Sequence, residues 1–288
     1  MLLAGLCTVD VVQRVSQFPA PGEKVQSLRV DVAAGGPATN AAVTVAALGA
    51  GATLVTVVGA HPLAALAHGD LLACGVDVVD LDPDRADPPP VSAVVVRDSD
   101  GERTVVSRNA AAGGSLAVPD VEPLVRDAGA VLVDGHHPEL ALAVARAARS
   151  RGVPVVLDAG SWKPVLDELV PLVDVAACSA HFRAPGVSLR DRGVPVEIRT
   201  AGPAPVQWRS EEDSGEVPVA VPDNAVEARD TLGAGDVWHG ALAYAIARGH
   251  GSVPTWIRHA NAVAAERVRH VGPRSWTAAI SKLGEVVR

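Results

Sequence analysis

Short apolar runs alternate with alanine-rich segments of helical length along most of the chain. One such unit predicts a strand over Ala130–Asp134, a helix over Pro138–Arg151 and a further strand over Val153–Asp158. Pro138 would stand in the first turn of that helix and Gly152 would cap its C-terminal end, as these residue types commonly do. Because continuously apolar strands joined by helices form sheets covered on both faces, we predict an α/β fold with a mostly parallel sheet.

The same alternation reaches both ends of the chain and locates a candidate site. It predicts further strands over Met1–Leu6, Thr53–Gly59, Val76–Leu81, Leu172–Cys178 and Val194–Thr200. It predicts further helices over Pro37–Leu48, Pro62–Cys74, Lys163–Leu169, Ala234–Arg248, Val253–Val271 and Ser275–Val287. Ligands of parallel sheets bind beyond the carboxyl ends of the strands. The polar residues at those ends, which we expect to face one crevice, are Asp10, His136, Asp158, Ser179 and Thr200.

Two segments read as strands without intervening helices. They are Gln13–Val32 and Val91–Ser107, and the second contains the polar turn Arg97–Glu102. Strands that follow one another without a crossover helix pair as antiparallel hairpins. We therefore predict a small antiparallel β flap, with a lid from about residues 11–33 and 91–107, on a single domain that spans residues 1–288.

Charge and cysteine content exclude several classes of protein. The formal net charge is −8 and no basic run occurs, which argues against nucleic acid or an anionic membrane as a partner. The three Cys are far apart and form no Cys-x-x-Cys pair, so we expect no disulfide framework, no metal site and a reduced, cytoplasmic setting. The apolar start is short and lacks a basic segment, so we expect neither a lipid anchor nor a membrane span.

The segment Asp230–Asp236, Asp-Thr-Leu-Gly-Ala-Gly-Asp, carries the clearest chemical signal. Gly233 and Gly235 reduce steric bulk where a helix is predicted to begin, so backbone N–H groups can approach a ligand. The first N–H groups of a helix lack internal partners and bind phosphate. Asp236 would place a carboxylate beside that anion site, an arrangement suited to phosphoryl transfer. Taken alone, a short Gly-x-Gly-Asp string is more often only a capped helix with a tight turn.

The complete seven-residue string resembles the second signature of ribokinase-like (PfkB) sugar kinases, and the resemblance covers nearly the whole chain. It implies an ATP-dependent kinase in which Asp236 is the catalytic base. The amides of Gly233, Ala234 and Gly235 would form the anion hole. No Gly-x-x-x-x-Gly-Lys-[Ser/Thr] string is present, which excludes a P-loop kinase, and no complete Gly-x-Gly-x-x-Gly string follows a strand, which excludes a dinucleotide-binding dehydrogenase.

The resemblance also assigns a sugar-binding side. Gly35 and Gly36 begin a Gly-Gly-x-x-x-Asn element that ends at Asn40, and this element resembles the one that cradles the sugar in the family. Asn40 offers both a donor and an acceptor to a hydroxyl. Asp10 stands where the family places a carboxylate that accepts bonds from sugar hydroxyls. The alternatives are a structural Asn at a helix start and a turn Asp.

Three further candidates come from their expected positions. His136 follows a strand and is expected to touch the sugar, as a polar residue does in relatives; a metal site formed with His137 is disfavoured because adjacent residues face apart. Arg103 lies on the flap and could close over the substrate. Lys163, one of only three Lys, could reach a phosphate of ATP. For Arg103 and Lys163 a solvent-facing role is the alternative.

The resemblance places the nucleotide beside residues from the C-terminal half of the chain. Thr200 and Gly202 match a Thr-x-Gly turn beside the nucleotide phosphates and ribose, and Asn261 and Gly272 are placed near the adenine. Ser179 stands at a position that is usually Asn. A surface position on its helix is the alternative for Asn261.

The main departure from the family pattern is Ser179-Ala180-His181-Phe182, where relatives usually have Asn-x-x-Glu that organises the water shell of Mg²⁺. Phe182 cannot replace that carboxylate, although ketohexokinase-like members depart here too. His239 stands where Asn is commoner. The cofactors implied are ATP and Mg²⁺, and activation by a monovalent cation stays open.

The sequence therefore predicts an ATP-dependent sugar kinase whose acceptor is a small carbohydrate, with a ketose or hexose favoured and a pentose as the alternative. A nucleoside kinase of the same family and a catalytically weak sugar- or nucleotide-binding sensor also remain as alternatives. We expect a homodimer, because exposed flap edges are commonly covered and flaps of this family often pair between subunits.

Overall fold

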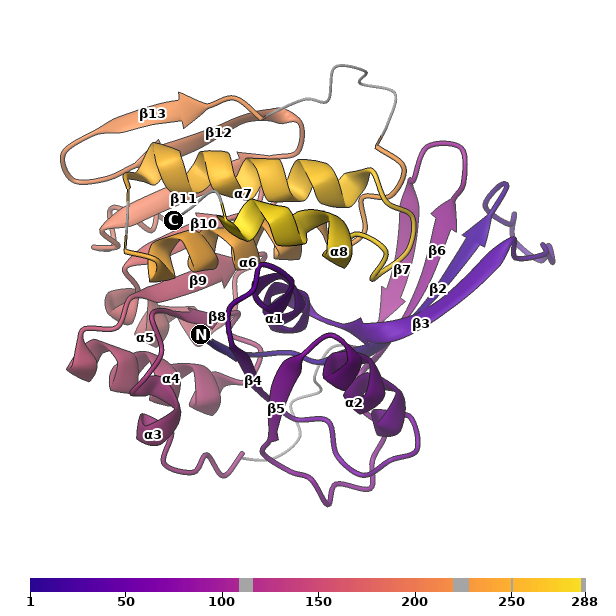
Figure 1. Cartoon of the computed structure of the whole chain (residues 1–288), viewed down its shortest axis with the longest axis horizontal. Coiled ribbons are helices and arrows are strands. Elements are labelled where there is room, and N and C mark those ends of the chain that lie inside the picture. Colours follow the sequence, from indigo (N-terminus) through magenta and orange to yellow (C-terminus); the bar gives the residue numbers. More distant parts are fainter. Residues whose placement is uncertain (109–115, 220–227, 250, 286–288) are drawn as a thin grey trace.

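The computed structural model describes residues 1–108, 116–219, 228–249 and 251–285 of the chain. Within these ranges, nine strands form one sheet in the order β13-β12-β11-β10-β9-β8-β1-β4-β5 (Figure 1). The strands are β1 Leu2–Ala4, β4 Ala52–Thr56, β5 Val76–Asp80, β8 Val131–Val133, β9 Val155–Ala159, β10 Val175–Cys178, β11 Val196–Ala201, β12 Ala204–Arg209 and β13 Ser214–Val217. Every pairing from β11 to β5 is parallel. The mostly parallel α/β fold is confirmed.

Helices cover both faces of this sheet, as Figure 1 shows. The α-helices are α1 Pro37–Ala47, α2 Ala64–Ala73, α3 Glu122–Val125, α4 Pro138–Arg151, α5 Leu166–Leu169, α6 Ala234–Ala247, α7 Val253–Val268 and α8 Thr277–Ile280. The 3₁₀ helices are η1 Val170–Leu172 and η3 Ser281–Glu285.

Alternate strand residues divide the core into two clusters, one on each face of the sheet. Leu3 and Leu54 pack with α1, α2, α6, α7 and α8, whereas Leu2 and Val55 pack with α3, α4 and α5. Successive side chains of a strand point to opposite faces, so apolar residues at every position bury both faces. This explains why the strands read as continuous apolar runs.

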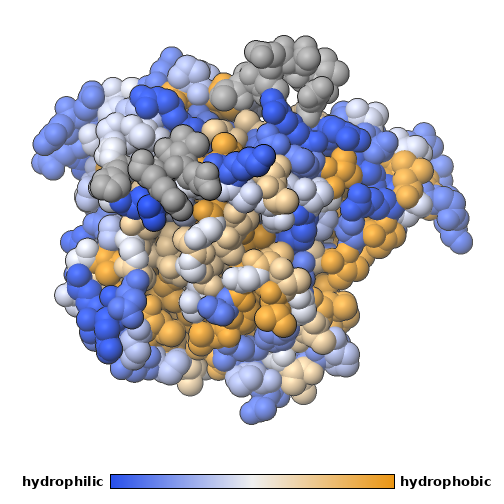
Figure 2. Space-filling model, viewed as in Figure 1, coloured by the Kyte–Doolittle hydropathy of each residue, from blue (hydrophilic) through white to orange (hydrophobic). Residues whose placement is uncertain are grey.

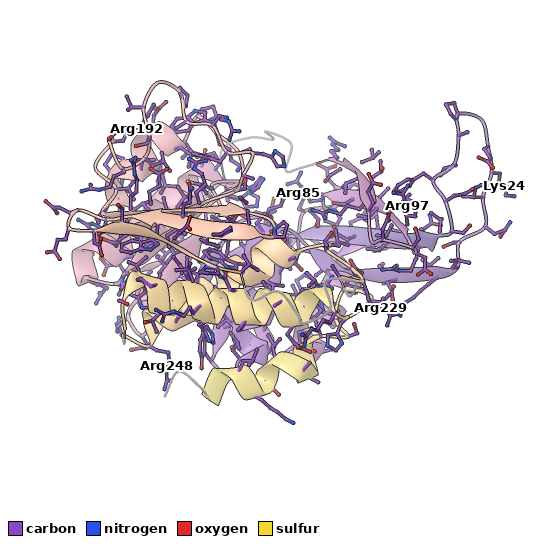
Figure 3. All side chains as sticks on the ribbon, turned by 90° about the horizontal axis from the view of Figure 1, so that it is seen from above. Lys24, Arg85, Arg97, Arg192, Arg229 and Arg248 are labelled. Atoms are coloured by element: carbon purple, nitrogen blue, oxygen red, sulfur yellow. The ribbon has the colours of Figure 1, made fainter. Side chains whose placement is uncertain are left out.

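A second sheet of four strands has the order β3-β2-β6-β7. Its strands are β2 Thr8–Val15, β3 Arg29–Gly35, β6 Val91–Arg97 and β7 Arg103–Ser107. The outer pairs are antiparallel and the central pair, β2 with β6, is parallel. Seen from above in Figure 3, this small sheet projects from the main body, with Lys24 at its far end. We call it the lid.

Several predicted boundaries differ from the structure. The first flap strand begins at Thr8 and not at Gln13, and the second continues to Gly35, so the lid reaches the carboxyl edge of the main sheet. The helix predicted over Lys163–Leu169 is one turn, followed by a 3₁₀ turn that contains Pro171, because proline removes a helical N–H donor. The last predicted helix divides into α8 and η3, and residues 286–288 lie outside the described residues.

The sequence interpretation missed β12 and β13, which extend the main sheet as antiparallel strands. In β12 only Val206 and Trp208 are buried, so the strand has too few apolar residues to be recognised from the sequence. In the part of the chain that the structure describes, no helix combines the length and apolar character needed to cross a membrane.

Candidate active site

The start of α6 forms the centre of the candidate site. Gly233 precedes the helix with φ 71°, a left-handed conformation that suits glycine. The N–H of Ala234 donates to the carbonyl of Thr231 at 3.2 Å. Within the described residues, the N–H groups of Gly235 and Asp236 have no protein acceptor. Of the predicted anion hole, the amide of Gly235 is therefore free to bind a ligand and that of Ala234 is used in a turn; the free amide of Asp236 was not part of the prediction.

Close packing of α1 on α6 brings Asn40 to Asp236. A Cβ at Gly240 would lie 2.6 Å from the carbonyl oxygen of Ala41, so only glycine permits this approach. The Nδ2 of Asn40 donates to Oδ2 of Asp236 at 2.9 Å. The residue predicted to hold the sugar thus also orients the predicted base.

Arg274, which the sequence interpretation missed, fixes the orientation of Asn40. Its Nη1 donates to Oδ1 of Asn40 at 3.3 Å, which leaves the Nδ2 donor of that amide for Asp236. Arg274 is itself held by Asp70, with an Nη2–Oδ2 distance of 2.8 Å, and by the carbonyl of Ala34. A chain of polar contacts therefore runs from Asp70 to the base.

The surroundings of Asp236 raise its pKa to about 6. Burial makes the largest contribution, and the negative charge of Asp158 adds to it. The bond from Asn40 and the charge of His239 oppose the rise, whereas Asp10 adds a smaller increase. Asp236 remains partly exposed, so a ligand can reach its carboxylate. A carboxylate with a pKa near neutrality is well matched to accept a proton from a hydroxyl.

One turn further along α6, His239 forms a buried ion pair with Asp158. Its Nδ1 lies 2.8 Å from Oδ2 of Asp158, and the two side chains are 5% and 4% exposed. Burial opposes protonation of His239, but the charges of Asp158 and Asp236 outweigh it and raise its pKa. A protonated His239 partly offsets the charge of Asp158 beside the base. The sequence singled out His239 as a departure but gave no sign of its partner.

Asp10 and the Gly35–Gly36 pair meet beside α1. A Cβ at Gly35 would overlap the carboxylate of Asp10, and a Cβ at Gly36 would overlap the carbonyl of Leu6. The hydroxyl of Thr8 donates to Oδ1 of Asp10 at 2.6 Å. Burial raises the pKa of Asp10, opposed by that bond. Gly35 therefore lets the chain pass close to the carboxylate of Asp10, and Gly36 lets it pass close to the carbonyl of Leu6.

A cleft of about 350 Å³ opens where the lid meets the carboxyl edge of the main sheet. We call it the edge cleft. Ser92, Val105 and Ser107 line it from the lid, and Gly36, Asp134, His136, Asp158 and Lys163 line it from the body. The structure thus brings His136 and Lys163 to the same cleft as Gly36. Asp10, Asn40 and Gly233 line a smaller cavity next to α6.

Arg103 and Arg14 tie the lid to the loop that precedes α6. The Nη1 of Arg103 donates to the hydroxyl of Thr231 at 2.8 Å, so Arg103 contacts the signature segment and does not line the edge cleft. Arg14 pairs with Asp230 at 3.2 Å and with Asp98 at 3.1 Å. The lid therefore rests on the segment that positions the base.

The residues predicted to bind the nucleotide do not all line one cleft. Thr200 lines a cleft of about 600 Å³ with Phe182, Arg183 and Arg199, which we call the β11 cleft. Ser179 lies at the end of β10, where its hydroxyl donates to the carbonyl of Gly160 at 2.9 Å. Gly202 lies in the turn between β11 and β12, with φ 59°.

Phe182 is fully buried, with its ring 6.2 Å from that of Trp162. The position where relatives usually have Glu is therefore part of the core. Within the described ranges, no group of three or more His, Cys, Asp or Glu is arranged to hold a metal ion.

Asn261 and Gly272 lie away from both clefts. Asn261 is 2% exposed; its Oδ1 accepts from Trp238 Nε1 at 2.7 Å, and its Nδ2 donates to the carbonyl of Pro218 at 3.1 Å. Both polar groups are used inside the protein. The N–H of Gly272 donates to Asp230 at 3.0 Å, so this glycine supports the signature loop. Neither residue lines the edge cleft or the β11 cleft.

Comparison with known proteins agrees with this geometry. The sequence profile described as pfkB family carbohydrate kinase matches residues 1–181 and 187–279. The chain is 30% identical over 289 residues to the ATP-dependent ribose-1-phosphate kinase of Halopiger xanaduensis, covering 96% of this chain and 94% of that protein.

Two further proteins extend the comparison. A ribokinase of Arabidopsis thaliana is 30% identical over 189 residues, which cover 61% of this chain and 48% of that protein. The solved structure of the Thermotoga maritima ribokinase superposes with a TM-score of 0.77 at 20% identity, covering 99% of this chain and 98% of that one. This last likeness supports the fold.

Proposed function

The chain belongs to the pfkB family of carbohydrate kinases, and from this premise we propose that it transfers the γ-phosphoryl group of ATP to a hydroxyl of a small sugar, with Asp236 as general base. It is a phosphotransferase with an alcohol group as acceptor. The observation that carries the assignment of the base is the position of its carboxylate beside the free amides that begin α6.

The proposed reaction follows from that arrangement. The acceptor oxygen attacks the γ-phosphorus while the bond from that phosphorus to the β,γ-bridging oxygen breaks, and the hydroxyl proton passes to Asp236. The N–H groups of Gly235 and Asp236 donate to the oxygens of the transferred group, where negative charge is spread in the transition state. Asn40 holds the carboxylate in place throughout.

On the acceptor side, Asp10 and the backbone at Gly35 and Gly36 would contact sugar hydroxyls. They lie with Asn40 on the side of α6 that the lid covers. The relatives described above are named for ribose and ribose 1-phosphate, which are pentoses. Their names support a pentose acceptor as much as the sequence supports a ketose or hexose. A small sugar is therefore the acceptor class that we propose.

On the nucleotide side, Thr200, Gly202 and Ser179 lie at the carboxyl ends of β10 and β11 and would contact ATP. Lys163 lines the edge cleft with the lid residues and not the β11 cleft, so we place it on the acceptor side. Mg²⁺, bound to the phosphates of ATP and to water, would neutralise phosphate charge during transfer. No step of the proposed mechanism requires a protein ligand to this ion.

We also propose a homodimer formed through the lid, in the cytoplasm where ATP is available. Val106, Leu28 and Val30 are 72%, 61% and 57% exposed, and β3 and β7 are the outer strands of the lid sheet among the described residues. Figure 2 shows apolar side chains among the charged ones over the lid. Sedimentation velocity should show a dimer that Val106→Lys weakens; a parent monomer at all concentrations would remove this proposal.

The assignment is tested by phosphoryl transfer. With ATP and Mg²⁺, the parent should release ADP in response to at least one of D-ribose, D-fructose, their phosphates and a nucleoside. Asp236→Asn should lower kcat by a factor of about 10² to 10⁴, as loss of a general base does, with the KM for ATP little changed. A variant with parental kcat would exclude Asp236 as the base.

A further inference from the structure

Lys163 lines a cleft and has no carboxylate partner within the described ranges. The chain has three Lys, and the other two, Lys24 and Lys282, are exposed. Lys163 lines the edge cleft and is only partly exposed. Its ammonium donates to the carbonyl of Ser161 at 3.4 Å, and no carboxylate among the described residues lies within ion-pair distance. An ammonium without a carboxylate partner, facing a cavity, is suited to bind an anion.

His136 stands beside Lys163 in the same cleft. A Cβ at Gly135 would lie 3.6 Å from Cδ of Lys163, so the lysine stem runs over the residue that precedes His136. The Nδ1 of His136 lies 3.2 Å from Oδ1 of Asp134, and this side chain lines the cleft. Two side chains from different loops, after β8 and after β9, therefore bring an imidazole and an ammonium to one end of the cleft.

The nearby carboxylates are already engaged. Asp134 accepts from the N–H groups of Leu6 and His136 at 2.9 Å each and from that of Ala38 at 3.3 Å. Asp158, also in this cleft, is paired with His239. The charge of Lys163 is thus left for a ligand.

Lys163 and His136 lie on the acceptor side of the site. The edge cleft is lined by Ser92 and Val105 of the lid and by Gly36, which begins α1, whereas Thr200 lines the separate β11 cleft. Asp10 lies towards Asn40 and the base, in the neighbouring cavity. The acceptor side therefore has a carboxylate end for hydroxyl groups and a cationic end.

We propose that the acceptor is an anionic sugar derivative, carrying a phosphate, sulfonate or carboxylate, and that Lys163 and His136 bind this group. The inference rests on the proposed kinase function and specifies its substrate class. The anionic group takes no part in bond making or breaking. It orients the acceptor so that a hydroxyl at the opposite end meets Asp236, and the transferred phosphoryl group forms a new ester there.

Kinetics with matched acceptors test this inference. The pairs are D-ribose with α-D-ribose 1-phosphate, D-fructose with D-fructose 6-phosphate, and D-glucose with D-gluconate, each with ATP and Mg²⁺. At least one anionic member should have a higher kcat/KM than its neutral partner by a factor of about 10 or more. Lys163→Met should lower that kcat/KM about 10- to 100-fold, the range for a charge-assisted contact, through KM.

Controls separate the two levels of the proposal. Lys282→Met removes an exposed lysine and should leave every constant unchanged. His136→Gln should act on the anionic members in the same direction as Lys163→Met. A parent that prefers neutral sugars, or a Lys163→Met variant that raises the KM for ATP alone, would overturn the anionic acceptor while leaving the kinase function intact. If no acceptor is phosphorylated, the kinase function fails with it.

Discussion

The two ends of the signature segment hold the same residue type in opposite surroundings. Asp230 is 1% exposed and lies between the guanidinium groups of Arg14 and Arg267, at 3.2 and 3.6 Å. It also accepts the N–H groups of Leu232 and Gly272 at 3.0 Å. Asp236 is partly exposed and accepts a hydrogen bond from one neutral donor, Asn40. The neighbouring charge with the largest effect on its pKa is a second carboxylate, that of Asp158.

This difference separates a structural carboxylate from a reactive one. Cations and amides surround the buried Asp230, which joins the lid, the signature loop and the end of α7. Asp236 is left under-neutralised, and burial with a neighbouring negative charge makes it a better proton acceptor. Asp230 and Asp236 are only six positions apart, but they contact different elements and therefore have different roles.

The largest expected effect concerns stability at Asp230. Asp230→Asn would leave the buried guanidinium group of Arg267 without a carboxylate and Arg14 with only the half-exposed Asp98, and breaking a buried pair costs about 3–5 kcal/mol. Chemical denaturation of this variant should show that loss in the free energy of unfolding.

Asp236→Asn is the matched comparison. It removes a carboxylate whose pKa is raised in the folded state, so the charged form is less favourable in the fold than in the unfolded chain. Its free energy of unfolding at pH 7 should equal or exceed that of the parent. A marked loss of stability in Asp236→Asn, or no loss in Asp230→Asn, would contradict the assignment of Asp230 as structural and Asp236 as reactive.

A smaller effect is expected at Arg274, which acts through Asn40. Arg274→Gln should release the amide of Asn40 and lower kcat about tenfold, because the base is no longer held in one orientation. Asp70→Asn is the control, since it weakens the anchoring of Arg274 but leaves its bond to Asn40 available. The kcat of Arg274→Gln should be below that of Asp70→Asn; equal values would assign Arg274 a purely structural role.

The fold was predictable because strands buried on both faces must be apolar at every position. The alternation with helices then dictated a parallel sheet, and the helix that begins after Gly233 followed from its motif. The antiparallel extension by β12 and β13 was missed, since edge strands bury fewer residues and carry a weaker pattern. The predicted helix ends near Pro171 and Ser281 were also wrong, because short 3₁₀ turns replace the α-helix there.

The site was predictable only in part. Asp236, Asn40 and the glycines follow from local motifs, whereas Arg274 lies 234 positions from Asn40 and has no local signal. The resemblance to the family placed Asn261 near the adenine but gave no sign of its contacts inside the protein. Its side chain contacts Trp238 and Pro218, and such contacts are set by packing and not by position in the sequence.

The dependence of kcat/KM on pH tests the central claim most directly, since it reports the ionisation of the base before transfer. Asp236 must be ionised to accept a proton, and its raised pKa of about 6 places the loss of activity at unusually high pH for an aspartate. With the best acceptor, kcat/KM should be level above pH 7 and fall tenfold per pH unit below a midpoint of about 6. A profile that stays level down to the ordinary aspartate value of 3.8 would contradict the account.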